Sequence, residues 1–431
     1  MEIAAIKPSE LRGILQYVPR FRDRTFVIAL DGAVVEAGRL RALLTDVAVL
    51  RSLNVKVVIV HGAAAQIRRL AAAEGRTVSN ADGSGPADEP TLELAVRAAN
   101  QVAHEILSGL SAQGLRAAVP NALHARPIGI VKGVDYRRAG RVERADGALL
   151  HSLLDHQIIP VLLPLGFDGE GRVLRLNSDA VAVAVSRVLS AVKIVYVTPY
   201  DGLRAGRTLL RHIPAEELEK LLEADARLLL PEEARPKARC AVEACKAGVP
   251  RVHIINGLLE EALLAEVFSP EGIGTLICTA DYEKIRPAAR ADAPAIYRLI
   301  RPAMGKEELM RRTRAEIERQ IEDFFVMEAD RRPIACVAFH PYPELRLGEV
   351  ACLCVHPAHE NQGVAGRLLR HVERLARERG FTRLIALSTQ AYAYFEEKAG
   401  FREGRLTDLP EERKERYLRA ARRSKILVKD L

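Results

Sequence analysis

The segment Val355–Leu369 limits the possible folds most, because it joins a strand end, a glycine-containing turn and the start of a helix. The turn Gln362–Gly366 lacks large side chains where the helix is expected to begin. Backbone N–H groups at such a position can point at an anion, and the helix dipole favours negative charge there. The sequence therefore predicts a phosphate-binding turn at the N-terminus of this helix.

The segments on either side of the turn alternate between strand and helix patterns. Glu349–Val355 is an apolar run rich in strand-forming residues. After the turn, apolar residues between positions 368 and 376 recur at helical spacing, and Gly380 ends that helix. Leu384–Ser388 reads as a second strand, followed by a helix at about 393–398. We therefore expect the order strand, anion-binding turn, helix, strand, helix.

This order of elements resembles the second half of the GNAT acetyltransferases, which bind acetyl-coenzyme A. The resemblance implies that acetyl-coenzyme A is the co-substrate and that its pyrophosphate lies at the turn. Glu360 departs from the family, which usually has arginine or glutamine at that position. The residues implied to contact the cofactor are Leu353, Cys354 and Val355 on the strand, and Gln362, Gly363, Val364, Ala365 and Gly366 in the turn.

Acetyl transfer to an amine needs a base that deprotonates the amine and an acid that protonates the leaving thiolate. Glu349 is the candidate base, acting through a water, although it could also be only a polar strand end. Tyr392 and Tyr394 are the candidate acids, and Ser388, at the strand end, is a candidate to assist them. The alternative roles are packing for each tyrosine and helix capping for Ser388.

The first 280 of the 431 residues show a different pattern, in which buried-type strands alternate with helical stretches. Strands are predicted at Thr25–Leu30, Val55–Val60, Ile158–Leu163, Lys193–Val197 and Arg251–Ile255. Helical segments between parallel strands cover both faces of a sheet. We therefore predict an α/β fold with a mostly parallel sheet.

The whole chain resembles the bacterial-type N-acetylglutamate synthases, in which an amino acid kinase fold is joined to a GNAT domain. The matching segments are Gly133–Tyr136 with Gly140-Arg141, Glu271–Thr275, Leu299–Pro302 and Arg422–Ile426. The resemblance implies an αβα sandwich of the amino-acid-kinase type at residues 1–280, a linker at 281–285 and a GNAT α/β domain at 286–431. It also implies a homo-oligomer.

The activity implied by this resemblance is transfer of acetyl from acetyl-coenzyme A to the α-amino group of L-glutamate, the first step of arginine biosynthesis. Two other functions stay open on the residues alone. One is a non-catalytic arginine-sensing regulator, and the other is a GNAT acetyltransferase that acts on a different amine.

The kinase-like part departs from its family where phosphate should bind. Ala29–Gly32 stands in place of Lys-x-Gly-Gly, and His61–Ala64 in place of His-Gly-Gly-Gly. Phosphoryl transfer depends on stabilising charge, and these changes remove a cation and add side chains. We therefore expect this domain to be kinase-inactive and to serve regulation and oligomerisation, with Asn177, Asp179 and Lys237 as structural remnants.

Two further sets of residues follow from the resemblance. Glutamate has two carboxylates, so its site needs cationic anchors; the candidates are Arg312, Arg422 and Ser424, with Arg413 in addition. L-arginine is expected as a feedback effector, bound by Tyr17, His253, Glu266 and Gly272. The alternative is that Tyr17 anchors the core and that Glu266 is a solvated helix residue.

Composition excludes several other classes of protein. The net charge is +8, but only 5% of residues are aromatic and none is tryptophan, so nucleic-acid binding is not expected. The sequence has no apolar run long enough to span a bilayer and no signal segment. Six cysteines without paired spacing fit a reducing cytoplasm. Cys352, Cys354, His356 and His359 imitate a metal site, but we expect no metal, since two of them alternate along a strand.

Overall fold

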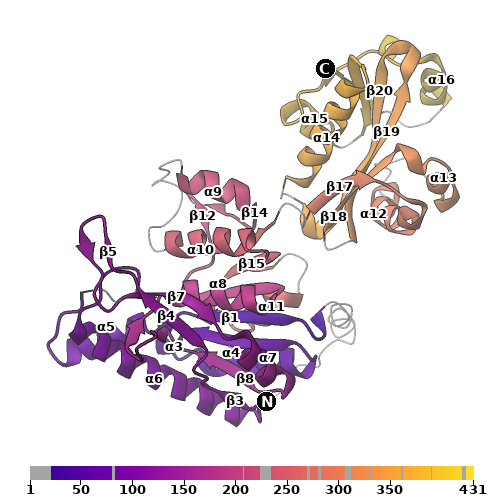
Figure 1. Ribbon diagram of the computed structural model, residues 1–431. Coiled ribbons are helices and arrows are strands. Elements are labelled where there is room, and N and C mark those ends of the chain that lie inside the picture. Colours follow the sequence, from indigo (N-terminus) through magenta and orange to yellow (C-terminus); the bar gives the residue numbers. More distant parts are fainter. Residues whose placement is uncertain are drawn as a thin grey trace. The chain divides into compact units, whose positions relative to one another are not determined.

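The structure is a computed structural model that describes residues 21–79, 83–206, 208–223, 234–268, 272–279, 283–305, 312–329, 332–360, 363–389, 391–419 and 424–431. The chain forms two compact units, Met1–Ala280 and Asp281–Leu431 (Figure 1). Each unit is described by itself.

The first unit is built on a sheet that has eight strands within the described residues. Their order across the sheet is β14 (His212–Pro214), β16 (Thr275–Cys278), β15 (Arg251–Asn256), β11 (Lys193–Thr198), β1 (Thr25–Leu30), β2 (Lys56–His61), β8 (Ile159–Leu162) and β3 (Ala117–Ala118). Neighbouring strands are parallel except β15 and β16. This confirms the mostly parallel sheet. Parallel strands with both faces covered read as continuous apolar runs, which is why the sequence located them.

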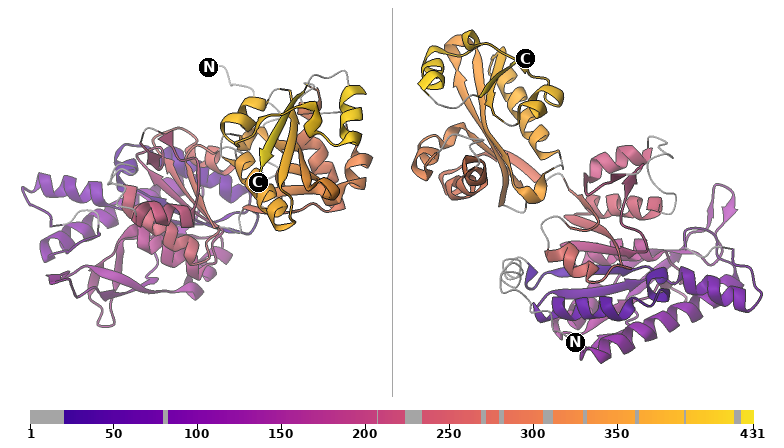
Figure 2. Two further views of the ribbon diagram at one scale, coloured as in Figure 1. Left: turned by 90° about the horizontal axis from the view of Figure 1, so that it is seen from above. Right: turned by 180° about the vertical axis from the view of Figure 1, so that it is seen from behind.

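Helices cover both faces of this sheet. One face carries α7 (Gly147–Asp155), α8 (Ser178–Val188), α9 (Ala215–Glu223) and α10 (Arg235–Lys246). The other carries α3 (Gly32–Glu36), α4 (Leu40–Ser52), α5 (Ala64–Ala73), α6 (Glu89–Ala112) and α11 (Ala262–Phe268). Figure 2 shows the long helix α6 running along the sheet. The predicted αβα sandwich is confirmed.

Shorter strands extend this unit. A second sheet consists of β10 (Val173–Arg175), β9 (Leu165–Phe167), β4 (Leu123–Pro127) and β7 (Gly140–Ala145). Two hairpins are formed by β5 (Ile130–Val131) with β6 (Val134–Asp135), and by β12 (Arg204–Ala205) with β13 (Thr208–Leu209).

The second unit is built on a mostly antiparallel sheet. Its order is β17 (Glu283–Pro287), β18 (Phe324–Ala329), β19 (Arg332–Tyr342), β20 (Leu347–Val355), β21 (Arg383–Ser388), β23 (Lys425–Asp430) and β22 (Arg402–Glu403). Only the central pair β20–β21 is parallel among the strands described. The predicted linker differs from the structure at residues 283–285, which pair with β18 as part of β17. Charged residues dominate this short strand, so no apolar run in the sequence indicated it.

Helices also lie on both faces of the second sheet (Figure 1). The predicted helix after the turn is α14 (Val364–Glu378), which packs its apolar face on the sheet beside α15 (Tyr392–Glu397). On the opposite face, α12 (Ala293–Gly305) and α13 (Arg314–Arg319) bury Ile300 and Ile317. The last helix, α16 (Glu411–Arg419), follows β22.

Candidate acyl-transfer site

The two parallel strands at the centre of the second sheet separate part of the way along. Their pairing runs from Leu347–Arg383 to Val350–Ala386, and both strands continue beyond it. The register of β20 against β19 shifts here, and Cys352 has a φ of 50°. Positive φ is uncommon for a residue other than glycine, and an extra residue in one strand increases local twist. The bulge therefore turns β20 away from β21 and opens a gap between them.

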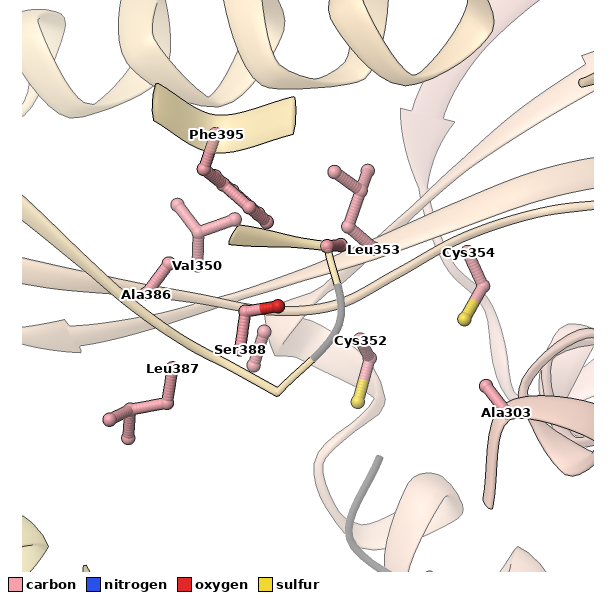
Figure 3. A pocket seen from close by; sticks show the side chains of 11 residues that line it. Ala303, Val350, Cys352, Leu353, Cys354, Ala386, Leu387, Ser388 and Phe395 are labelled. Carbon is pink, nitrogen blue, oxygen red and sulfur yellow. The ribbon is translucent and has the colours of Figure 1, made fainter. Parts of the chain in front are cut away.

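A pocket of about 320 Å³ occupies this gap. The residues that line it come from β20, β21, α15 and the end of α12: Ala303, Val350, Ala351, Cys352, Leu353, Cys354, Ala386, Leu387, Ser388, Ala391 and Phe395. The hydroxyl of Ser388 points into this space (Figure 3). Two of the predicted cofactor residues, Leu353 and Cys354, lie on its wall, whereas Val355 is not part of the lining. The walls are largely apolar, as in most small-molecule sites.

The predicted anion-binding turn leads directly into α14. Gly363 has a φ of 73° and occupies the position before the first helical residue, Val364. Gln362 lies outside the described residues. A Cβ added at Gly366 would lie 3.4 Å from a guanidinium nitrogen of Arg370 and 3.5 Å from the hydroxyl of Tyr394. The small residues therefore add little bulk to the first turn of α14, and the guanidinium of Arg370 lies beside this turn.

The candidate base Glu349 is buried and ion-paired. Nε of Arg413, on α16, donates to both carboxylate oxygens at 2.9 Å each. The hydroxyl of Tyr342 donates to Oε2 at 3.3 Å. Burial, together with the nearby Glu349 carboxylate, raises the pKa of Tyr342 to about 12. Arg413, which the sequence suggested as a glutamate anchor, therefore contacts the candidate base itself.

A second cationic group, Arg312, contacts the residue that is paired with Glu349. His340 is directly opposite Glu349 in the β19–β20 pairing, and its Nε2 is 3.4 Å from a terminal nitrogen of Arg312. Burial raises the pKa of the Cys352 thiol, and the charges of Arg312 and Glu349 act on it in opposite directions. Both charged groups are therefore close to the bulge that borders the pocket.

Glu349 and Ser388 lie on opposite faces of the sheet, and of the two only Ser388 lines the pocket. Glu349 pairs with Ile385 across β20 and β21, so these two side chains share a face. Ser388 is three residues beyond Ile385, and side chains alternate along a strand. The hydroxyl thus borders the pocket, and the carboxylate lies on the opposite face, close to where the paired part of the strands ends.

The remaining candidates lie elsewhere. Tyr392 is 37% exposed, and Nζ of Lys425 lies 4.5 Å from the centre of its ring. Neither Tyr392 nor Tyr394 lines the pocket. The hydroxyl of Tyr417 donates to the backbone carbonyl of Ser424 at 2.7 Å, which ties α16 to the start of β23. Arg422 lies outside the described residues.

In the first unit, three of the predicted effector residues form one buried cluster. Nδ1 of His253 is 2.6 Å from Oε1 of Glu266. The other oxygen of Glu266 accepts from the backbone N–H groups of Ile273 and Gly274, at 2.6 and 3.0 Å. A Cβ on Gly272 would lie 2.9 Å from that carboxylate. Burial would raise the pKa of Glu266, but these hydrogen bonds lower it to about 2.

The Glu266 cluster shows why this segment contains glycine, since only a residue without a Cβ fits beside the carboxylate. It also shows that Glu266 is buried rather than solvated. Tyr17, the remaining effector candidate, lies outside the described residues.

The kinase-like phosphate region is filled by side chains of the chain itself. Nζ of Lys237 donates to both oxygens of Asp179 at 3.0 Å and lies 3.6 Å from Oδ2 of Asp31. Burial alone would lower the pKa of Lys237, but these carboxylates raise it. Gln66 donates to the carbonyl of Gly32 at 2.8 Å, in a fully buried contact. The Lys237 ammonium that could meet a phosphate is thus paired with carboxylates.

Comparison with known proteins places both units. Residues 24–256 match the amino acid kinase family, and residues 293–401 match the acetyltransferase (GNAT) family. Curated amino-acid acetyltransferases include one from Ralstonia nicotianae, 34% identical over 98% of this chain and 94% of the relative. Another, from Neisseria meningitidis serogroup B, is 36% identical over 98% of both chains.

Solved structures agree with this placement. N-acetylglutamate synthase from Neisseria gonorrhoeae, crystallised with coenzyme A and L-arginine, is 35% identical, with a TM-score of 0.79 over 98% of this chain and 99% of the other. A structure of the same protein with coenzyme A and N-acetyl-glutamate is 36% identical, with a TM-score of 0.63 over the same shares.

The fold and the split strands define a GNAT acetyltransferase joined to an amino acid kinase fold. The chain belongs to the amino-acid acetyltransferase family. Among the residues described, no helix is long and apolar enough to cross a membrane, and no group of three or more histidine, cysteine, aspartate or glutamate side chains could hold a metal ion.

Proposed function

We propose that the chain transfers acetyl from acetyl-coenzyme A to the α-amino group of L-glutamate, which yields N-acetylglutamate for arginine biosynthesis. One observation carries this proposal: Ser388 lines the pocket in the split between β20 and β21, and Glu349 lies on the opposite face of the sheet, one residue before the last paired position of β20. The family relationship and the relative crystallised with coenzyme A and N-acetyl-glutamate support it.

The chemistry follows from the two faces of the sheet. The acyl-thioester arm enters the pocket beside α14, whose N-terminal turn holds the pyrophosphate. The amino acid binds on the Glu349 face. Glu349 takes a proton from the substrate ammonium through a water, and the amine then attacks the thioester carbonyl. The tetrahedral intermediate collapses and the C–S bond breaks. Ser388 donates its proton to the leaving thiolate and regains a proton from the newly acylated nitrogen, which thereby becomes the neutral amide. The transfer is direct, without an acetyl-enzyme.

Recognition of glutamate is assigned to the cationic groups around Glu349. The guanidinium of Arg413 contacts the base, and that of Arg312 contacts His340, which is paired with the base; a planar guanidinium suits a carboxylate. Arg422 and Ser424 remain candidates through the resemblance. Since Arg413 binds Glu349, we assign its main role to holding the base in place.

The proposal for the first unit is regulation rather than phosphoryl transfer. Lys237 is ion-paired with Asp179 and Asp31. These carboxylates already neutralise the positive charge that a phosphate group would need. The His253–Glu266 cluster and Gly272 are proposed to belong to an L-arginine site, which the arginine-bound relative supports. We further propose a cytoplasmic homo-oligomer; six cysteines without paired spacing suit a reducing compartment.

The experiment is release of free thiol from acetyl-coenzyme A with L-glutamate, compared with aspartate, ornithine and glutamine as acceptors. Release that depends on L-glutamate and is much weaker with the other acceptors supports the proposal. Equal turnover of all four acceptors would favour a broader amine acetyltransferase. Phosphorylation of N-acetylglutamate with ATP, measured in parallel, is expected to stay at background.

A further inference from the structure

We propose that Asp323 and His340 act together as a positioning pair for Arg312, and so determine how tightly the carboxylate of the acceptor is held. The inference rests on the proposed function for the identity of the acceptor. None of the sequence patterns singled out either residue.

The contact chain runs across three elements. Asp323 ends the 3₁₀ turn Ile321–Asp323, and its Oδ2 lies 2.7 Å from Nδ1 of His340 on β19. Nε2 of His340 lies 3.4 Å from a terminal nitrogen of Arg312. The side chains of His340 and Asp323 are 16% and 30% exposed. The pair is therefore partly shielded from water but not fully buried.

Hydrogen-bond chemistry fixes the tautomer of His340. A carboxylate only accepts, so Nδ1 must carry the proton that is donated to Asp323. Arg312 only donates, so Nε2 must present its lone pair to the guanidinium. The arrangement requires a neutral imidazole with its proton on Nδ1, because an Nε2–H would face another donor. Asp323 selects that tautomer, as second partners of histidine commonly do.

Arg312 is also held from two other directions. Its other terminal nitrogen donates to Oε1 of Gln320 at 2.9 Å, and its guanidinium carbon lies 6.0 Å from the ring centre of Phe324. Fixing an arginine side chain in one conformation costs conformational entropy. The contacts with His340, Gln320 and Phe324 already restrict Arg312, so less entropy is lost when a carboxylate binds. His340 stands opposite Glu349 in the strand pairing, so the anchored guanidinium contacts the residue that is paired with the base.

The first test reads the tautomer directly. Nitrogen NMR of ¹⁵N-histidine-labelled protein, with the His340 signals assigned by their loss in His340→Asn, should show a neutral ring protonated on Nδ1. Asp323→Ala should abolish that preference. A ring of wild-type His340 that is protonated on Nε2, or on both nitrogens at neutral pH, would overturn the inference whatever the acceptor is.

The second test separates the two nitrogens by kinetics. The longer amide side chain of His340→Gln can place an acceptor near the Nε2 position, whereas the shorter one of His340→Asn reaches only the Nδ1 position. His340→Asn should raise KM for L-glutamate about ten-fold, in line with loss of a hydrogen bond to a charged group. His340→Gln should stay near wild type, and KM for acetyl-coenzyme A should stay unchanged in both.

A double variant shows whether His340 acts through Arg312. If it does, adding His340→Asn to Arg312→Ala should not raise KM for L-glutamate further. Arg314→Ala is the control, since this nearby side chain is 61% exposed and pairs with Glu318 on its own helix. Additive effects of the two substitutions would contradict the proposal.

The two tests also keep this inference separate from the proposed function. Wild-type protein that shows no thiol release with L-glutamate would count against that function, and the tautomer measurement would then decide on the positioning pair. Normal wild-type turnover with an unchanged KM in His340→Asn would reject the positioning pair alone.

Discussion

Nε of Arg413 donates to both carboxylate oxygens of Glu349, at 2.9 Å each, and so joins α16 to the centre of the sheet. The two side chains are only 14% and 6% exposed. A buried carboxylate left without its partner is strongly unfavourable. The ion pair therefore contributes to folding as well as to the arrangement of the site.

Removing Arg413 alone should destabilise the second unit. Arg413→Met leaves the buried Glu349 charge unpaired, with an expected loss of about 3 kcal/mol or more in the free energy of unfolding. Combining it with Glu349→Gln removes that charge and should restore most of the loss. Urea unfolding of the two single variants and the double variant measures both effects. An equal loss in Arg413→Met and in the double variant would show that the pair has no such role.

Replacing the base should affect turnover more than binding. Glu349→Gln keeps the size of the side chain but cannot accept the proton, so kcat should fall by roughly 10²- to 10⁴-fold. Binding of acetyl-coenzyme A, measured by calorimetry, should be retained because Glu349 does not line the pocket. A variant with kcat near wild type would leave Glu349 as a structural residue.

The three candidate acids can be separated by single-atom changes. Ser388→Ala removes the hydroxyl that points into the pocket and should lower kcat by roughly 10²-fold. Tyr392→Phe and Tyr394→Phe serve as matched controls, because neither side chain lines the pocket. Steady-state rates at saturating substrate decide among them. Loss of activity in either tyrosine variant, with Ser388→Ala unaffected, would reassign the acid.

The Glu266 cluster predicts how arginine inhibition can be removed. Glu266→Gln weakens the bond to His253 and the hold on the loop at Ile273 and Gly274. The concentration of L-arginine needed for half-inhibition should rise about ten-fold or more, as for loss of a charged hydrogen-bond partner. Inhibition is measured as a fraction of each variant's own uninhibited rate. Unchanged arginine sensitivity in both Glu266→Gln and Tyr17→Ala would place the effector elsewhere.

A buried histidine predicts acid sensitivity of the first unit. Burial lowers the pKa of His61 from 6.5 to about 4, and among the described groups its Nε2 has no hydrogen-bond partner. Between these pH values the unfolded chain binds the proton more readily, so stability is lost as pH falls from about 6.5 to 4. The loss should approach about 3 kcal/mol.

The matched variant for this effect is His61→Leu, which replaces the ring by an apolar side chain that does not titrate. Urea midpoints of the first unit at pH 7 and pH 4.5 should differ less in this variant than in wild type. The same difference in both proteins would assign the acid sensitivity to other groups.

Much of the fold could be predicted because its strands and helices leave local patterns. The buried strands β1, β2 and β11 are continuous apolar runs, and α14 repeats its apolar residues at helical spacing. β17 was missed, since Lys284 and Arg286 leave no such run. Local patterns of this kind predicted only some of the residues of the site.

What the sequence could not predict depends on register and on distant contacts. The bulge at Cys352 uses a non-glycine residue, so no glycine marks it. The placement of His340 opposite Glu349 depends on how β19 and β20 pair. Arg413 lies 64 residues from Glu349, and a charge run gives no signal for which member is buried. His340 and Asp323 carried no motif at all.

The most direct measurement of the central claim is the identity of the product. The protein is incubated with acetyl-coenzyme A carrying a ¹³C-labelled acetyl group and with L-glutamate, and the mixture is followed by NMR and mass spectrometry. We expect labelled N-acetylglutamate in amounts equal to the free thiol released, and at least roughly 10²-fold less in the same time with Glu349→Gln. Thiol release without N-acetylglutamate, or the label attached to another amine, would contradict it.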